Sequence, residues 1–155
     1  MNNILVAIDF SDVTPKVIEQ AAKIARCFSS KLWLIHIAAP EPDFVGYSTG
    51  PQCERDWIAN TLREEHQYLQ DRALELETKG IDVTPLLVQG ATVETILKEA
   101  SKLNAELIVI GSHKHGILYK TLVGSVGKQI IERATCPILM IPERDSASSQ
   151  AIANS

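Results

Sequence analysis

Two short stretches in the last third of the chain carry the residue types that bind a phosphate group. Gly111 and Ser112 directly follow the apolar run of residues 107–110, and Gly124 and Ser125 open a later segment with helical periodicity. Backbone N–H groups and a hydroxyl at a helix N-terminus favour an anion, because the helix dipole is positive there. These residues therefore predict a phosphate-binding site. The alternative is that Gly111 only shapes a turn and that Ser125 only caps a helix.

The spacing of these glycines differs from two common nucleotide-binding motifs. The chain has no GxxxxGK[ST], and its glycines follow the fourth apolar run rather than the first. No GxGxxG follows the first run either. The predicted site is therefore neither a Walker P-loop nor a dinucleotide-binding fingerprint.

The histidines do not predict a metal centre held by the protein alone. His113 and His115 lie two residues apart, but no third ligand is near them in the sequence. A Mg²⁺ or Mn²⁺ ion would instead be held mostly by the phosphates of a bound nucleotide. His36 lies in an apolar run and is interpreted as a buried core histidine. His66 is interpreted as a structural residue facing the seam of a long helix.

Five short apolar runs alternate with four segments of helical periodicity. The apolar runs cover residues 4–8, 32–37, 83–88, 107–110 and 138–141, and the periodic segments cover residues 17–28, 58–76, 93–103 and 126–134. The runs lack polar alternation, which is typical of strands buried on both faces. The order predicts an α/β fold with a parallel sheet between two layers of helices. Thr14 and Thr92 are predicted N-caps, and Gly80 is predicted to end the second helix.

Composition and charge exclude several classes of protein. The chain has 155 residues and a net charge of −4, with 45% hydrophobic and 22% charged residues. No apolar run approaches the roughly 18 residues of a membrane span, and the N-terminus lacks the basic region of a signal peptide. The charge balance offers no surface for duplex nucleic acid. We therefore expect no membrane and no nucleic-acid partner.

Three cysteines without a CxxC pair predict a reducing, cytoplasmic location. Cys27 and Cys136 are predicted to be small buried residues. Residues 1–142 are predicted to form a single domain, and residues 143–155 a flexible C-terminal tail. Residues 39–56 contain three prolines and two glycines, and they predict a long loop.

Several stretches of the chain resemble the universal stress protein family. They are Ile4-Leu-Val-Ala-Ile-Asp-Phe-Ser11, Leu34-Ile-His-Ile37, Ile108-Val-Ile-Gly-Ser-His-Lys-His-Gly116, Leu122-Val-Gly-Ser-Val126 and Cys136-Pro-Ile-Leu-Met-Ile-Pro142. The resemblance covers about residues 2–142. Members of the ATP-binding branch carry G-x2-G-x9-G-[ST], which Gly111, Gly124 and Ser125 match, whereas Lys114 replaces the second glycine.

The resemblance implies a role for each matching position in a nucleotide site. Asp9 would bind the adenine or ribose end, although it could instead cap the first helix. Ala7 and Ile37 would line the base pocket, and Ile110 and Gly111 would form the floor near the ribose. The phosphate end would be formed by Ser112, His113, Lys114, Gly124, Ser125 and Val126. Lys114 either occupies the phosphate space and strains the backbone, or points outward and even pairs with the phosphates.

The resemblance also implies a fold and a function. The fold is an open five-stranded parallel sheet of order 3-2-1-4-5 with four helices, like that of adenine-nucleotide α-hydrolases. The function is an ATP- or AMP-binding regulatory module in the stress response, with little or no hydrolysis and an unknown protein partner. A homodimer would form through Ile138, Leu139, Met140 and Ile141, an apolar run expected at a sheet edge. The alternative is a dimeric stress protein that binds no nucleotide and acts through protein contacts.

Overall fold

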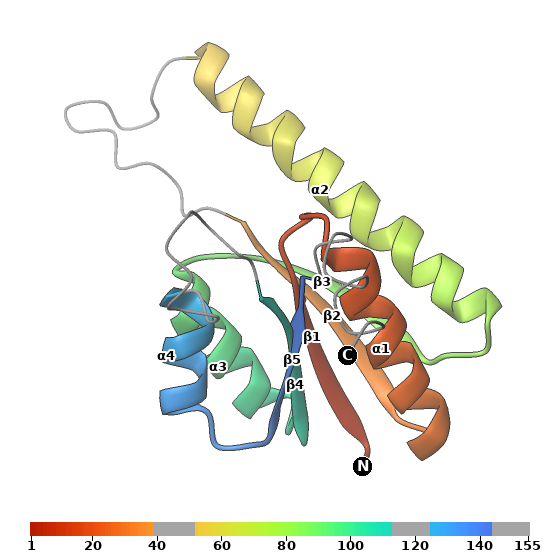
Figure 1. Ribbon diagram of the computed structural model, residues 1–155. Coiled ribbons are helices and arrows are strands. Elements are labelled where there is room, and N and C mark those ends of the chain that lie inside the picture. Colours follow the sequence, from red (N-terminus) through yellow and green to blue (C-terminus); the bar gives the residue numbers. More distant parts are fainter. Residues whose placement is uncertain (39–51, 113–124, 144–155) are drawn as a thin grey trace, which may run out of the picture.

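The strands of the computed structural model form one parallel sheet of order β3-β2-β1-β4-β5 (Figure 1). The structure describes residues 1–38, 52–112 and 125–143. The strands are β1 (Asn3–Ile8), β2 (Lys31–Ala38), β3 (Val83–Gln89), β4 (Leu107–Ser112) and β5 (Ile138–Pro142). The helices are α1 (Thr14–Phe28), α2 (Gln52–Thr78), α3 (Thr92–Lys102) and α4 (Ser125–Arg133). The predicted fold class and strand order are confirmed.

Helices cover both faces of the sheet (Figure 1). Ile4, Val6 and Ile8 of β1 pack in one core with α1 and α2, whereas Leu5 packs in a second core with α3 and α4. Successive side chains of a strand point to opposite faces, so a strand covered on both faces needs a continuous apolar run. Burying one such side chain contributes about 1.5–3 kcal/mol, which explains why the central strands tolerate no polar alternation.

The central position of β1 brings distant segments to one edge of the sheet. β1 pairs with β2 in a register that sets Ile8 opposite His36, and it pairs with β4 on its other side. All strands run in the same direction, so their carboxyl ends lie at the same edge. The carboxyl ends of β1, β2 and β4 therefore lie side by side there.

Helix α2 is longer than the sequence predicts, and its two halves differ in how deeply their side chains are buried. Residues 52–56, predicted as part of a loop, form its first turns, where Arg55 and Gln52 are hydrogen-bonded. In the second half Leu69, Ala73 and Leu76 are buried, whereas no described side chain of the first half is. The first half extends past the end of the sheet (Figure 1). Gly80, with a φ of 78°, ends the helix as predicted.

The predicted N-caps of two helices are each displaced by one residue. Thr14 and Thr92 are the first residues of α1 and α3, and the N-cap positions hold Val13 and Ala91. Neither N-cap makes a side-chain capping bond. The turn before α1 closes early, because the Thr14 N–H donates to the Ser11 carbonyl at 2.9 Å. The Thr14 hydroxyl instead lies 3.4 Å from Oδ1 of Asp9.

Several side chains predicted to be inside are exposed. Cys27 and His66 are exposed, and so are Phe28 at the end of α1 and Val126 and Ile131 on α4. A helix turns by about 100° per residue, so the neighbours of a buried residue point away from the core. Ile131 follows the buried Ile130, for example. Within the described part of the chain, no helix is long and apolar enough to cross a membrane.

Residues 39–51 of the predicted loop and residues 144–155 of the predicted tail lie outside the described residues.

Cys27 and Cys136 should differ in reactivity. Cys27 is exposed, whereas Cys136 is half-buried and burial raises the pKa of its thiol. The thiolate is the reacting form, so we expect N-ethylmaleimide to label Cys27 several times faster than Cys136 in the native protein. Peptide-resolved mass spectrometry over a time course measures both rates. Equal labelling rates for Cys27 and Cys136 in the native protein would contradict their different exposure. The control is labelling in urea, where the two rates should be equal.

Candidate functional site

A cavity of about 390 Å³ lies at the carboxyl edge of the sheet, where the ends of β1, β2 and β4 meet. Its volume is within the range of about 300–1,000 Å³ typical of small-molecule sites. The eight described residues that the sequence predicts for a nucleotide site all line it: Ala7, Asp9, Ile37, Ile110, Gly111, Ser112, Ser125 and Val126. The other three, His113, Lys114 and Gly124, lie outside the described residues.

Most of the cavity wall is apolar, and the polar groups come from a few positions. The residues that line it beyond those predicted are Ile8, Val13, Thr14, Val17, Ile35, His36, Thr92, Ile96, Gly127, Ile130 and Met140. Many of them are core residues at the ends of strands and helices. Periodicity assigns such residues to the core but does not show which of them border a cavity.

Three helices begin at this cavity, each with a hydroxyl residue. Thr14 is the first residue of α1, Thr92 of α3 and Ser125 of α4, and all three line the wall. The first N–H groups of a helix have no partner within the helix, and its dipole is positive at that end. The cavity therefore favours an anionic ligand. The sequence predicts Thr14 and Thr92 only as N-caps and gives no local signal that they line a cavity.

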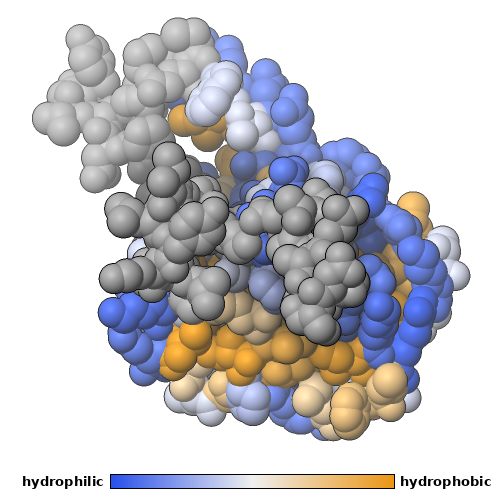
Figure 2. Space-filling model, in the orientation of Figure 1, coloured by the Kyte–Doolittle hydropathy of each residue, from blue (hydrophilic) through white to orange (hydrophobic). Residues whose placement is uncertain are grey.

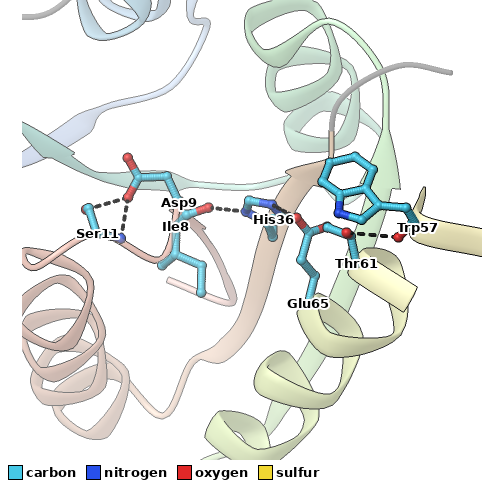
Figure 3. Close-up of polar contacts among 7 residues, drawn as sticks. All are labelled: Ile8, Asp9, Ser11, His36, Trp57, Thr61 and Glu65. Atoms are coloured by element: carbon cyan, nitrogen blue, oxygen red, sulfur yellow. Dashed lines mark hydrogen bonds and ion pairs between the residues drawn. The ribbon is translucent and has the colours of Figure 1, made fainter. Parts of the chain in front are cut away.

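The carboxylate of Asp9 shapes the turn between β1 and α1. Its Oδ1 atom accepts a hydrogen bond of 2.6 Å from the Ser11 hydroxyl and one of 3.3 Å from the Ser11 N–H (Figure 3). The Thr14 hydroxyl lies 3.4 Å from the same atom. These contacts fit the alternative prediction for Asp9, in which its carboxylate holds the start of α1 rather than a ligand. The side chain also lines the cavity, so its ligand role stays a prediction.

Gly111 allows α1 to pack closely on β4. A Cβ atom at this position would lie 2.6 Å from Cγ1 of Val13 and 3.3 Å from Cγ2 of Val17. The sequence predicts that this glycine either shapes a turn or forms part of a ligand site. The described contact is a different one: the space beside Gly111 is filled by side chains from α1.

We also searched the described residues for a metal site and for further cavities. No group of three His, Cys, Asp or Glu side chains is placed to hold a metal ion within residues 1–38, 52–112 and 125–143. A second cavity, of about 450 Å³, lies at the opposite edge of the sheet near the ends of α3 and α4. Its wall includes Ser101, Asn104 and Thr135.

Comparison with known proteins shows the family. The sequence model of the Universal stress protein family matches residues 1–142, so the chain belongs to this family. It is 28% identical to universal stress protein YxiE of Bacillus subtilis, over 90% of this chain and 98% of that protein. It is 30% identical to universal stress protein MJ0531 of Methanocaldococcus jannaschii, over 89% of this chain and 80% of that protein.

Solved structures share the fold. The structure of protein MJ0577 superposes with a TM-score of 0.79 at 23% identity, covering 94% of this chain and 98% of that one. An Archaeoglobus fulgidus universal stress protein in complex with dAMP gives a TM-score of 0.63 at 22% identity, covering 91% and 98%. A universal stress protein in complex with cAMP gives 0.63 at 20% identity, covering 91% and 96%.

The contact of Gly111 with α1 can be tested without a ligand. We expect Gly111→Ala to lower the free energy of unfolding by about 1–3 kcal/mol, because the added methyl group overpacks the contact with Val13. Val13→Ala removes the clashing atoms, so the double variant should lose less stability than the sum of the single variants. Urea denaturation measures all four proteins. Additive losses would contradict the described packing.

Proposed function

We propose that this chain binds an adenine nucleotide, ATP or AMP, and acts as a regulatory module of the stress response. The observation that carries the proposal is the convergence of three helix N-termini, at Thr14, Thr92 and Ser125, on one cavity. A net charge of −4 gives no overall attraction for a polyphosphate. Local N–H groups and helix dipoles supply that attraction.

The rest of the wall suits a nucleoside. Ala7, Ile37 and Ile110 offer an apolar surface to a base, and Asp9 lies between that surface and the start of α1. A carboxylate accepts hydrogen bonds from ribose hydroxyls. Relatives of the same fold have been solved with cAMP and dAMP, which supports an adenine nucleotide here.

Hydrolysis should be slow. Phosphoryl transfer needs a positioned water and strong stabilisation of the developing charge, usually by an arginine or a lysine together with Mg²⁺. Among the described residues of the cavity wall, Asp9 is the one carboxylate, and none is an arginine or a lysine. We therefore assign at most weak ATPase activity to the chain. A Mg²⁺ or Mn²⁺ ion would be held mainly by the phosphates of the nucleotide.

A substitution at Lys114 distinguishes the two functions that the sequence leaves open, a nucleotide-binding module and a stress protein that binds no nucleotide. It replaces the second glycine of the family's ATP-binding motif. If its side chain points outward, Lys114→Gly leaves the affinity for ATP nearly unchanged. If wild-type protein binds no ATP and Lys114→Gly gains binding, the chain is instead a stress protein that works without nucleotide. We place either function in the cytoplasm, because the three cysteines of the sequence include no CxxC pair.

The ligand role of Asp9 can be separated from its structural role. Asp9→Asn keeps an oxygen that accepts from Ser11 but removes the second acceptor and the charge. We expect the affinity for ATP to fall about 10- to 100-fold, the usual loss for a hydrogen bond to a charged group. Asp12→Asn is the matched control, because Asp12 is exposed in the same loop and does not line the cavity. Isothermal titration calorimetry measures both variants.

Equal affinities in the wild-type protein and in both variants would remove Asp9 from the ligand site. No binding of ATP or AMP to wild-type protein would defeat the nucleotide proposal itself.

We also propose that the chain forms a homodimer through β5. Among the described strands, β5 has β4 as its one neighbour, and its side chains at Ile138, Leu139 and Met140 are half-exposed. Figure 2 shows a hydrophobic band across this face of the molecule, between more hydrophilic surfaces. An uncovered apolar edge strand is a template for pairing with another chain. A second copy of the chain supplies the matching strand.

Sedimentation equilibrium tests the dimer. We expect wild-type protein at tens of micromolar to be dimeric, and Leu139→Lys to shift it toward the monomer, because a charge at the edge strand opposes pairing. Leu74→Lys is the control, since Leu74 is 61% exposed on α2, away from the edge strand. A monomeric wild-type protein contradicts the proposal, as does a Leu139→Lys variant that is folded by circular dichroism and still dimeric.

A further inference from the structure

Phe10 holds a backbone conformation that its side chain disfavours. Its φ of 60° lies in the left-handed region, where a Cβ atom crowds the backbone and glycine is the usual residue. Ser29 and Asn104 also have a positive φ, but each follows the end of a helix, where a left-handed residue is common. Phe10 lies instead between β1 and α1. A bulky residue keeps such a conformation only where contacts with the rest of the structure hold it.

Two aromatic contacts hold the ring of Phe10. The ring stacks on the His36 imidazole, with the centroids 4.0 Å apart and the planes inclined by 28°. It also meets the Tyr68 ring edge-on, with the centroids 4.8 Å apart. Stacked and edge-to-face pairs are favourable beyond the burial of their surface. The side chain of Phe10 also packs against the core that α1 and α2 cover. Residues of β2 and α2 therefore fix the position of this ring.

Both aromatic partners are held by contacts outside the loop that carries Phe10. His36 is buried, and its Nδ1 atom donates a hydrogen bond of 2.9 Å to the carbonyl oxygen of Ile8, since a carbonyl only accepts (Figure 3). Ile8 also lies opposite His36 in the register of β1 with β2. On α2, the guanidinium of Arg72 lies over the Tyr68 ring, 5.4 Å from its centroid. The loop is therefore supported by two side chains that have anchors of their own.

The left-handed turn at Phe10 sets the direction of the Asp9 carboxylate. Phe10 separates Asp9 from Ser11, and the turn brings the Ser11 hydroxyl within 2.6 Å of Oδ1 of Asp9 (Figure 3). The chain then enters α1, where the Thr14 N–H donates to the Ser11 carbonyl at 2.9 Å. Asp9 and Thr14 line the cavity, whereas Phe10 does not. Phe10 can therefore affect a ligand only through the loop residues that it positions.

We propose that Phe10 is a positioning residue, whose ring contacts with His36 and Tyr68 fix the turn between β1 and α1. This turn presents the Asp9 carboxylate to a ligand in the cavity. The effect on a nucleotide rests on the proposed function, whereas the effect on the turn does not. Without the ring contacts, the backbone of residue 10 leaves the left-handed region, and the contact between Asp9 and Ser11 loosens.

NMR of the protein without ligand tests the turn. Phe10→Leu keeps an apolar side chain but removes both ring contacts. A positive φ brings the amide and Hα protons of a residue close together, so wild-type protein should give a strong nuclear Overhauser effect between them at residue 10. We expect this signal to weaken in Phe10→Leu and to persist in Phe10→Tyr, which keeps the ring. A weak signal in wild-type protein, or an unchanged one in Phe10→Leu, overturns the role of the ring.

Tyr68→Leu reaches the same turn from α2 and leaves the loop sequence intact. Tyr68 is half-buried and does not line the cavity. We expect the signal at Phe10 to weaken less than in Phe10→Leu, because the stack on His36 remains. Leu76→Ala is the matched control, since Leu76 is buried in the same core near the last turn of α2. A turn that responds to Leu76→Ala as strongly as to Tyr68→Leu contradicts a role for the ring contacts.

Calorimetry with ATP gives the functional readout through a double-mutant cycle with Asp9. We expect Phe10→Leu to lower the affinity of wild-type protein by about tenfold, within the usual range for coupling between two sites. In the Asp9→Asn background the same change should cost much less, because the charge that Phe10 positions is already gone. Phe10→Tyr and Leu76→Ala should bind ATP like the wild type.

Equal losses of affinity in the two backgrounds, or no loss in either, overturn the positioning role of Phe10. A loss in Leu76→Ala that matches the loss in Phe10→Leu overturns it as well, because the affinity would then follow stability alone. If wild-type protein binds no ATP, the proposed function fails, and the NMR comparison alone decides whether Phe10 fixes the turn.

Discussion

The pairing of β1 between β2 and β4 is the constraint on which the rest of the structure depends. A parallel strand in this position must be apolar on both faces, and the run from Ile4 to Ile8 meets that demand. Its central place also brings the ends of three strands to one edge of the sheet. Helix α1 also packs against β4, and it approaches closely there because Gly111 has no side chain. The cavity is the space left between these ends.

The chemistry of the cavity follows from backbone groups more than from charged side chains. Three helices begin at its wall, and each contributes a positive dipole end and a hydroxyl. An acidic protein can bind an anionic ligand in this way without any basic surface. The geometry also links the cavity to α2, because His36 contacts Glu65 on one side and the carbonyl of Ile8 on the other.

The sequence predicts the elements and the edge of the sheet at which the site lies. Apolar runs without alternation locate the five strands, and strand ends locate Asp9, Ile37 and Gly111 on the cavity wall. The resemblance to a family supplies the strand order. Local patterns miss what depends on contacts between distant segments. Periodicity says nothing of the contact between Gly111 and Val13, or of the contact between His36 and Glu65, because the partners are far apart in the chain.

The ends of helices and the exposure of single side chains are also harder to predict than the presence of a helix or a strand. The first turns of α2 form from residues that precede its apolar stripe, held by local contacts such as that of Arg55 with Gln52. Cys27 and Phe28 lie in a helical segment, but the end of α1 carries them away from the core. An apolar residue type therefore predicts burial less well than its angular position on the helix does.

A map of amide chemical shifts on addition of ATP tests the nucleotide site most directly. If ATP binds in the cavity, the amides of Ala7, Ile37, Gly111 and Ser125 shift together and saturate. Residues of the opposite cavity, such as Asn104 and Thr135, should stay unchanged. Shifts confined to that opposite cavity, or no saturable shift at all, would contradict a nucleotide site at the carboxyl edge of the sheet.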